Sequence, residues 1–136
     1  MNKIIKNIRT NILNLTFKAQ SSHIGSCLSI VEILAVLYIK VLKKNDRFIL
    51  SKGHAAVALY CTLYEKKLIS FKTLNTFGSN KTALMNHVSH KVNGVEFSTG
   101  SLGHGLPIAV GKALKFKINK ENKKVFVLLS DGEMNE

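Results

Sequence analysis

Histidine is the residue type in this sequence best suited to chemistry, and it occurs in predicted polar turns at five positions: His23, His54, His87, His90 and His104. An imidazole can donate, accept or transfer a proton near neutral pH, and it can also bind a metal ion. One histidine in a turn is usually a surface or capping group, but five of them favour a binding or catalytic site. A zinc site built from His87, His90 and a distant cysteine is a weaker alternative, because no third ligand has suitable spacing.

A glycine-rich segment at residues 99–105 leads into an apolar stretch with helical spacing. Backbone N–H groups at the start of a helix attract anions such as phosphate. The same glycines would also suit a turn that lets a helix and a strand pack closely. From the residues alone, both interpretations stay open.

An aspartate follows the most strand-like segment of the chain. Residues 125–129 are continuously apolar, which is typical of a central parallel strand, and Ser130, Asp131, Gly132 and Glu133 come next. Ligands bind at the carboxyl ends of strands in open α/β sheets. A carboxylate beside phosphate groups needs a bridging hard cation, so Asp131 predicts a Mg²⁺ site. A solvated Asp-Gly turn is the alternative.

Alternating helices and strands must position these turns. Apolar residues at helical spacing predict an amphipathic helix over residues 3–18. Ser29 and Glu32 have capping-box spacing and predict a second, nearly all-apolar helix to about Leu42, which should be buried. The other predicted elements are a polar turn over 20–27, a strand over 47–50, helices over 55–67 and 70–77, a loop over 79–94 and a helix from about Gly105. Together they predict one α/β domain over residues 1–136.

Composition limits the class of protein. The chain has 136 residues, of which 46% are hydrophobic, so it can bury a core and form one domain. A net charge of +12 would suit a nucleic-acid partner, but the lysines are scattered and no aromatic stacking motif accompanies them. We therefore expect no nucleic-acid binding.

Membrane and secretion signals are not predicted either. The longest apolar run, over residues 33–39, is too short to cross a bilayer, and basic residues interrupt the N-terminal segment. Cys27 and Cys61 have no metal-type spacing and no disulfide-rich context. A reducing cytoplasm is therefore the expected location.

Four motifs along the chain are together highly specific: Ser-His-Ile-Gly at 22–25, Asp-Arg-Phe-Ile-Leu-Ser-Lys-Gly-His-Ala at 46–55, Gly-Val-Glu-Phe-Ser-Thr-Gly-Ser-Leu-Gly-His-Gly at 94–105, and Leu-Leu-Ser-Asp-Gly-Glu at 128–133. In this order they resemble the N-terminal, diphosphate-binding domain of transketolases, and most of all the N-terminal subunit of the split, two-chain enzymes. The resemblance implies the thiamine diphosphate-binding fold, a parallel sheet flanked by helices. That fold would be incomplete in this chain, because the cofactor motif stops soon after its Asp-Gly-Glu.

The resemblance implies an enzyme that uses thiamine diphosphate and Mg²⁺ to transfer a two-carbon ketol unit from a ketose phosphate to an aldose. Asp131 would coordinate Mg²⁺. Cofactor contacts would come from seven residues: His54, Gly100, Ser101, Leu102, Gly103, Gly132 and Glu133. The implied catalytic residues are His23, which would face the reacting carbons, together with His87 and His104. His104 stands where single-chain transketolases usually have glutamine.

The chain departs from the family pattern at three places. Ser130 stands where the family has a glycine before the aspartate. The loop that supplies a substrate-contacting histidine is one residue out of register, which favours His87 over His90. The family's second metal ligand, an asparagine, would come after Glu136.

The resemblance also implies a partner chain with a pyrimidine-binding domain, which supplies the glutamate that activates the cofactor. We therefore expect these 136 residues to be inactive alone, and the complete enzyme to be a dimer or a heterotetramer. Two alternatives stay open. One is another thiamine diphosphate enzyme, of the 2-oxoacid dehydrogenase E1 or deoxyxylulose-phosphate synthase type, and the other is a non-catalytic basic module that binds polyanions.

Overall fold

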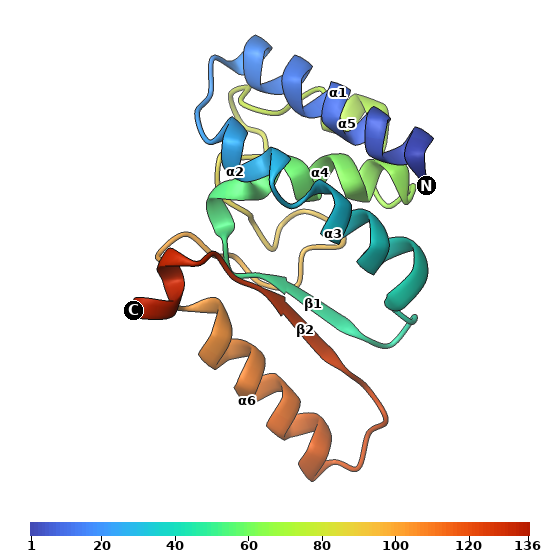
Figure 1. The fold of residues 1–136 in the computed structure, drawn as a ribbon, viewed down its shortest axis with the longest axis vertical. Coiled ribbons are helices and arrows are strands. Elements are labelled where there is room, and N and C mark those ends of the chain that lie inside the picture. The colour runs from blue at the N-terminus through green and yellow to red at the C-terminus, as the bar shows by residue number, and fades with distance from the viewer.

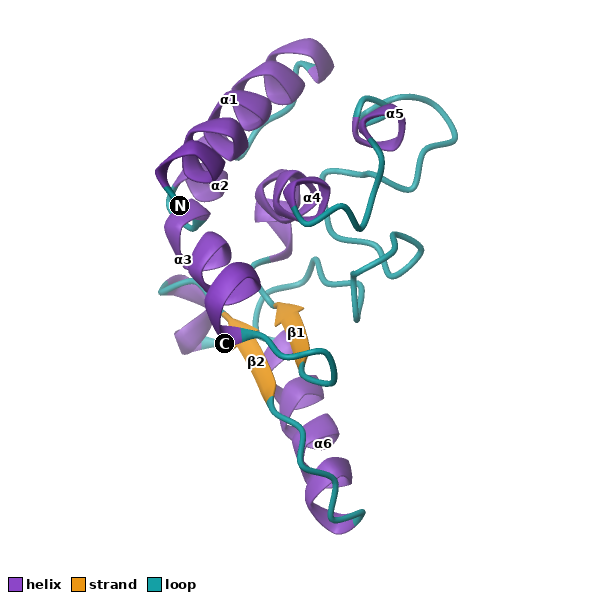
Figure 2. Cartoon of the chain, turned by 90° about the vertical axis from the view of Figure 1, so that its right-hand side faces the viewer, coloured by secondary structure: helices purple, strands orange, loops and turns teal.

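Two parallel strands form the centre of the fold, which a computed structural model describes over residues 1–136. β1 (Arg47–Leu50) and β2 (Val125–Leu128) pair along their whole length. α6 (Gly105–Ile118) lies on one side of this small sheet, and the helices of the first half of the chain lie on the other (Figures 1 and 2). Helices on both faces of a parallel sheet define an α/β fold, so the predicted fold class is confirmed.

The hydrophobic core lies between β1 and two long helices. α1 (Asn2–Ala19) points Ile8 and Ile12 inward, and both side chains are fully buried. α4 (Ala56–Glu65) packs against α1 and is buried along most of its length, as its small and apolar residues require. Both helices are predicted from the sequence, and the structure confirms them with slightly different ends.

The predicted capping box at Ser29 and Glu32 is wrong. α2 (Ile24–Leu28) ends at Ser29, which has helical dihedral angles and donates its hydroxyl proton to the Ser26 carbonyl at 2.9 Å. An N-cap needs extended backbone instead, so Ser29 cannot cap the next helix. Glu32 forms an ion pair at 2.7 Å with Arg9 of α1, which ties the two helical segments together.

The second predicted helix divides into α3 (Val31–Val36) and a π-helical turn, η1 (Leu37–Val41), and it is less buried than predicted. Ile33 and Val36 are 45% and 42% exposed. The segment Ile24–Val41 is long and apolar enough to cross a membrane, with a mean hydropathy of 2.0, and 33% of it is buried in this fold. Length and composition are weak indications here, because a core helix passes the same test.

Several shorter elements complete the fold. A 3₁₀ turn, η2 (Gly53–Ala55), follows β1, and a second one, η3 (Gly132–Asn135), follows β2. α5 (Phe71–Leu74) begins at Ser70, whose Oγ accepts the N–H of Thr73 at 3.0 Å. The long loop over residues 75–104, yellow to orange in Figure 1, is anchored in the core by five apolar side chains: Phe77, Leu84, Val88, Val92 and Val95.

β2 is not the fully buried central strand that the sequence predicts. All four of its residues are half-buried, because β1 is its only neighbour in the sheet. A parallel strand is buried on both faces only when further strands and helices flank it. Apolar side chains of α6 are exposed on the same side, with Val110 and Ile118 at 50% and 76%. The β2–α6 side of the fold is therefore only partly enclosed.

Packing of α1 predicts different costs for two neighbouring substitutions. Ile12→Ala should lower the free energy of unfolding by about 2–5 kcal/mol, because it leaves a cavity in the core. Leu13 is 48% exposed, so Leu13→Ala should cost less than about 1 kcal/mol. Urea denaturation followed by circular dichroism measures both values. Equal losses in the two variants would contradict the orientation of α1.

Candidate active site

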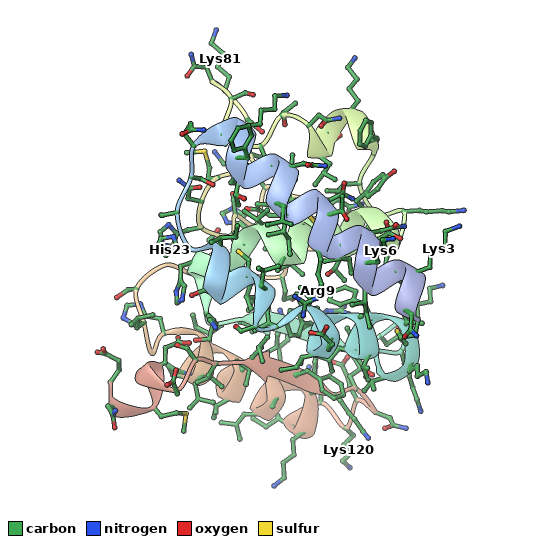
Figure 3. All side chains as sticks on the ribbon, turned by 45° about the horizontal axis from the view of Figure 1, so that its top comes forward. Lys3, Lys6, Arg9, His23, Lys81 and Lys120 are labelled. Atoms are coloured by element: carbon green, nitrogen blue, oxygen red, sulfur yellow. The ribbon has the colours of Figure 1, made fainter.

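Three imidazole rings from distant parts of the chain meet beyond the carboxyl end of β1. The ring centroid of His23 lies 5.3 Å from that of His54 and 6.0 Å from that of His87. His23 precedes α2, His54 lies in η2, and His87 lies in the long loop. Figure 3 shows His23 at the opposite end of the molecule from Lys3. A group of proton donors and acceptors at this edge of the sheet is a candidate active site.

Local structure holds two of these histidines in place. His23 has a φ of 67°, a left-handed conformation that is uncommon outside glycine and that turns the chain into α2. Its Nδ1 lies 3.1 Å from Ser22 Oγ. The Tyr60 hydroxyl of α4 donates to the carbonyl oxygen of His87 at 3.1 Å, which attaches the loop to the core.

The third histidine, His54, has a pKa below its ordinary value. Burial is the largest cause, followed by repulsion from positive charge on His23 and Lys52, while the Glu133 carboxylate acts in the opposite direction. A lowered pKa favours the neutral imidazole, which can both donate and accept a hydrogen bond. His54 is therefore suited to contact a polar ligand without carrying a fixed charge.

The remaining histidines lie outside this group. The Nδ1 of His90 lies 2.7 Å from Ser98 Oγ, and His104 is exposed at the start of α6 without a side-chain hydrogen bond. Cys27 and Cys61 are buried free thiols, and burial raises the pKa of both. No three His, Cys, Asp or Glu side chains are arranged to hold a metal ion, so the structure gives no support to a zinc site.

A buried carboxylate connects the segments beside the histidines. Glu133 is only 3% exposed, and each of its oxygens accepts two hydrogen bonds. Oε1 accepts from Ser51 Oγ at 2.6 Å and from the Gly103 N–H at 3.1 Å. Oε2 accepts from the Ser130 N–H at 2.8 Å and from Ser130 Oγ at 3.1 Å. Burial alone raises the pKa of Glu133, but these hydrogen bonds outweigh it and lower the pKa, so the buried group stays ionised.

The glycine-rich loop before α6 approaches the end of β1 closely. A Cβ atom on Gly53 would lie 2.5 Å from the carbonyl oxygen of Thr99, and one on Gly105 would lie 2.4 Å from Ser51 Oγ. The Gly105 N–H donates to that same Ser51 oxygen at 3.1 Å. These two glycines thus permit tight packing, the second of the two interpretations open from the sequence.

Only part of this loop is free to bind an anion. The N–H groups of Gly103 and Gly105 are already bonded to Glu133 and Ser51. The N–H groups of Gly100, Ser101 and Leu102 have no partner within the chain. Anion binding by this loop therefore falls to Gly100, Ser101 and Leu102.

Asp131 lies where the sequence predicts it, in the turn after β2. Its side chain is exposed and makes no hydrogen bond or ion pair, and a Cβ on Gly132 would meet no atom within 4 Å. Mg²⁺ is usually held by one or two carboxylates together with phosphate oxygens and waters. One free carboxylate, open space beside it, free N–H groups and nearby imidazoles fit a magnesium–diphosphate group.

Comparison with known proteins agrees with this geometry. The family model described as "Transketolase, thiamine diphosphate binding domain" matches residues 1–136. The chain belongs to the transketolase family. The resemblance carried by the four motifs is thus confirmed, and with it the thiamine diphosphate-binding type of domain.

Curated relatives within the family include single chains of split transketolases. An apulose-4-phosphate transketolase subunit of Phocaeicola vulgatus is 39% identical over 137 residues, covering 94% of this chain and 49% of that protein. The protein of the same name from Actinobacillus succinogenes is 41% identical over 147 residues, covering 100% and 53%. A 6-deoxy-6-sulfo-D-fructose transketolase subunit of a Clostridium species is 34% identical over 139 residues, covering 95% and 50%. The chain spans about half the length of these relatives.

Sequence reasoning missed the roles of two serines in this transketolase domain. The sequence pattern places Ser51 only in the turn after the strand predicted over 47–50, and Ser130 only as a variant of the family's glycine. In the structure both bond to Glu133. The available signal was their position: each follows a strand, at the edge where Glu133 lies.

The histidine group predicts that the pKa of His54 depends on its neighbour His23. The pKa of His54 should lie below the ordinary value of about 6.5, and His23→Ala should raise it, because the substitution removes both nearby positive charge and covering atoms. His104 is not among the causes of the shift, so His104→Ala should leave the pKa unchanged. NMR titration of the ring signals gives these values. A pKa of His54 that responds equally to both substitutions would contradict the placement of the three rings.

Proposed function

We propose that the complete enzyme transfers a two-carbon ketol unit from a ketose phosphate to an aldose, with thiamine diphosphate and Mg²⁺. The observation that carries this proposal is the convergence of His23, His54 and His87 at the carboxyl end of β1 in a chain of this family. Three imidazoles at one edge suit substrates that are rich in hydroxyl groups and carry a phosphate.

We assign the cofactor's diphosphate to the open side of the strand ends. Asp131 would hold Mg²⁺, and Gly132 leaves the space that the diphosphate needs. His54 and the free N–H groups of Gly100, Ser101 and Leu102 would donate hydrogen bonds to it. When bound, thiamine diphosphate supplies the carbanion chemistry that cleaves the bond beside a ketose carbonyl.

The protein's own contribution is to orient substrate and to move protons. His23 and His87 would bond to the hydroxyl or carbonyl oxygens next to the bond that is cleaved, and an imidazole there can accept or return a hydroxyl proton. His104 has no contact in this chain that defines its role, and we place it at the rim of the site. His90 is occupied by Ser98 and is not included.

Names of relatives suggest the substrate class and the partner. Two of the relatives are named for apulose 4-phosphate, and the third for 6-deoxy-6-sulfo-D-fructose. We propose a sugar carrying phosphate as substrate, and a second transketolase chain with a pyrimidine-binding domain as partner. These 136 residues would then show no turnover alone, and the active form would be an oligomer in the cytoplasm.

Removing the proposed metal ligand tests the cofactor assignment. In the complete enzyme, Asp131→Asn should abolish the Mg²⁺ dependence of thiamine diphosphate binding, because the phosphates lose their bridging cation. Glu65→Gln removes the same charge at the end of α4 and serves as the control. Calorimetric titration with and without Mg²⁺ measures the affinities. An unchanged, Mg²⁺-dependent affinity in Asp131→Asn would reject the assignment.

The substrate-side histidines predict a different pattern. His23→Ala and His87→Ala should each lower ketol transfer by about 10²–10⁴-fold, while thiamine diphosphate affinity stays nearly unchanged. Lys81→Ala, on an exposed turn, is the control for both. Rates are measured with a ketose phosphate donor and an aldose acceptor, and pyruvate is offered separately. A large loss of cofactor affinity, or turnover with pyruvate alone, would overturn the roles or the reaction.

A further inference from the structure

Glu133 joins three segments that all end at the site. Ser51 follows β1, Gly103 lies in the loop before α6, and Ser130 follows β2. All three donate hydrogen bonds to the one carboxylate, which is almost fully buried. The Ser51 hydroxyl also accepts the N–H of Gly105, so the chain of bonds continues to the first residue of α6.

This arrangement does not suit a direct ligand of the cofactor. A carboxylate has about four acceptor positions, and the chain's own donors occupy four on Glu133. Neither oxygen is left to coordinate a metal ion, and a buried negative charge would repel a diphosphate. The resemblance implies a cofactor contact for Glu133, but the hydrogen bonds favour another role.

We propose that Glu133 is a positioning residue that holds the glycine-rich loop and the Ser130–Gly132 turn against the end of β1. The Gly103 N–H donates to Glu133 and is not available to an anion, whereas the N–H groups of Ser101 and Leu102 do not bond to Glu133. The hydrogen bonds of Glu133 to Ser51, Gly103 and Ser130 are called the lock below. On the other side it fixes Ser130, the residue before the proposed metal ligand Asp131. The hydrogen bonds to Glu133 thereby fix the distance between the loop N–H groups that would bind phosphate and Asp131, which would bind the metal ion. The part of this proposal that concerns the cofactor rests on the proposed function.

The role requires a carboxylate rather than a polar group of the same shape. Glutamine at this position would turn its NH₂ group toward either the Gly103 or the Ser130 backbone N–H. Serine hydroxyls can rotate and accept a bond, but a backbone N–H cannot. In one orientation the NH₂ group faces the Gly103 N–H, and in the other it faces the Ser130 N–H. Two donors cannot bond to each other, so Glu133→Gln must lose the hydrogen bond to one of these two backbone groups.

Hydrogen exchange in the 136-residue chain tests the lock directly. In Glu133→Gln, exchange at the Gly103 or Ser130 amide should accelerate about tenfold or more, as expected for loss of a bond to a charged group. Core amides of α4 should keep the protection that the overall stability gives them. Glu121→Gln is the matched control, because Glu121 lies before β2 and its side chain bonds only to Asn119 and Lys123, each two positions away in the chain. Unchanged exchange at both amides would overturn the proposal.

A second variant decides the matter if Glu133→Gln does not fold. Ser51→Ala removes one donor to Glu133 and the acceptor of the Gly105 N–H. Unlike Glu133→Gln, it introduces no new donor that would face a backbone N–H. Exchange at the Gly105 amide should accelerate several-fold, with a smaller increase at Gly103. Protection equal to that of the unmodified chain at both amides would overturn the proposal.

Cofactor affinity separates positioning from general stability. In the complete enzyme, Glu133→Gln should weaken thiamine diphosphate binding about tenfold, whereas Ile12→Ala, which weakens only the core, should leave the affinity of the folded enzyme unchanged. Equal affinities in Glu133→Gln and the unmodified enzyme would overturn the positioning role. If the unmodified enzyme binds no thiamine diphosphate, the proposed function fails, while the exchange measurements still decide whether Glu133 locks the loop.

Discussion

The buried carboxylate of Glu133 is the constraint on which this end of the molecule depends. A charge removed from water is tolerated only when hydrogen bonds replace its hydration. Here the replacement comes from the ends of both strands and from the loop before α6. Satisfying one side chain therefore brings three segments to one point, and the close packing at Gly53 and Gly105 follows from that approach.

Two carboxylates two residues apart have opposite environments at this edge. Glu133 points inward and is saturated by the chain's own donors, whereas Asp131 is exposed and has no partner. The turn between them thus buries the carboxylate of Glu133, which has a structural role, and leaves the carboxylate of Asp131 exposed. A hard cation with phosphate oxygens needs the exposed one, so the same short segment can support the loop and remain available to a ligand.

The histidine group depends on the core in a different way. Parallel pairing puts the carboxyl ends of β1 and β2 at the same edge, where His54 lies. His23 reaches it because α1 and α2 pack against α4, and His87 reaches it because Tyr60 of α4 holds its backbone. The positions of His23 and His87 therefore depend on contacts with α4.

The sequence alone determined the fold class, the long helices, both strands and the family, because these follow from local patterns: apolar periodicity, β-prone runs and four motifs in order. It also selected Asp131 and favoured His87 over His90. Tertiary structure decided what depends on distant partners. Ser29 could not cap α3 because α2 ends on it, and β2 is half-buried because β1 is its only neighbouring strand. Glu133 became a buried acceptor rather than a group facing a ligand because Ser51, 82 positions away in the chain, donates to it. No local pattern records which donors a folded chain will bring to a carboxylate.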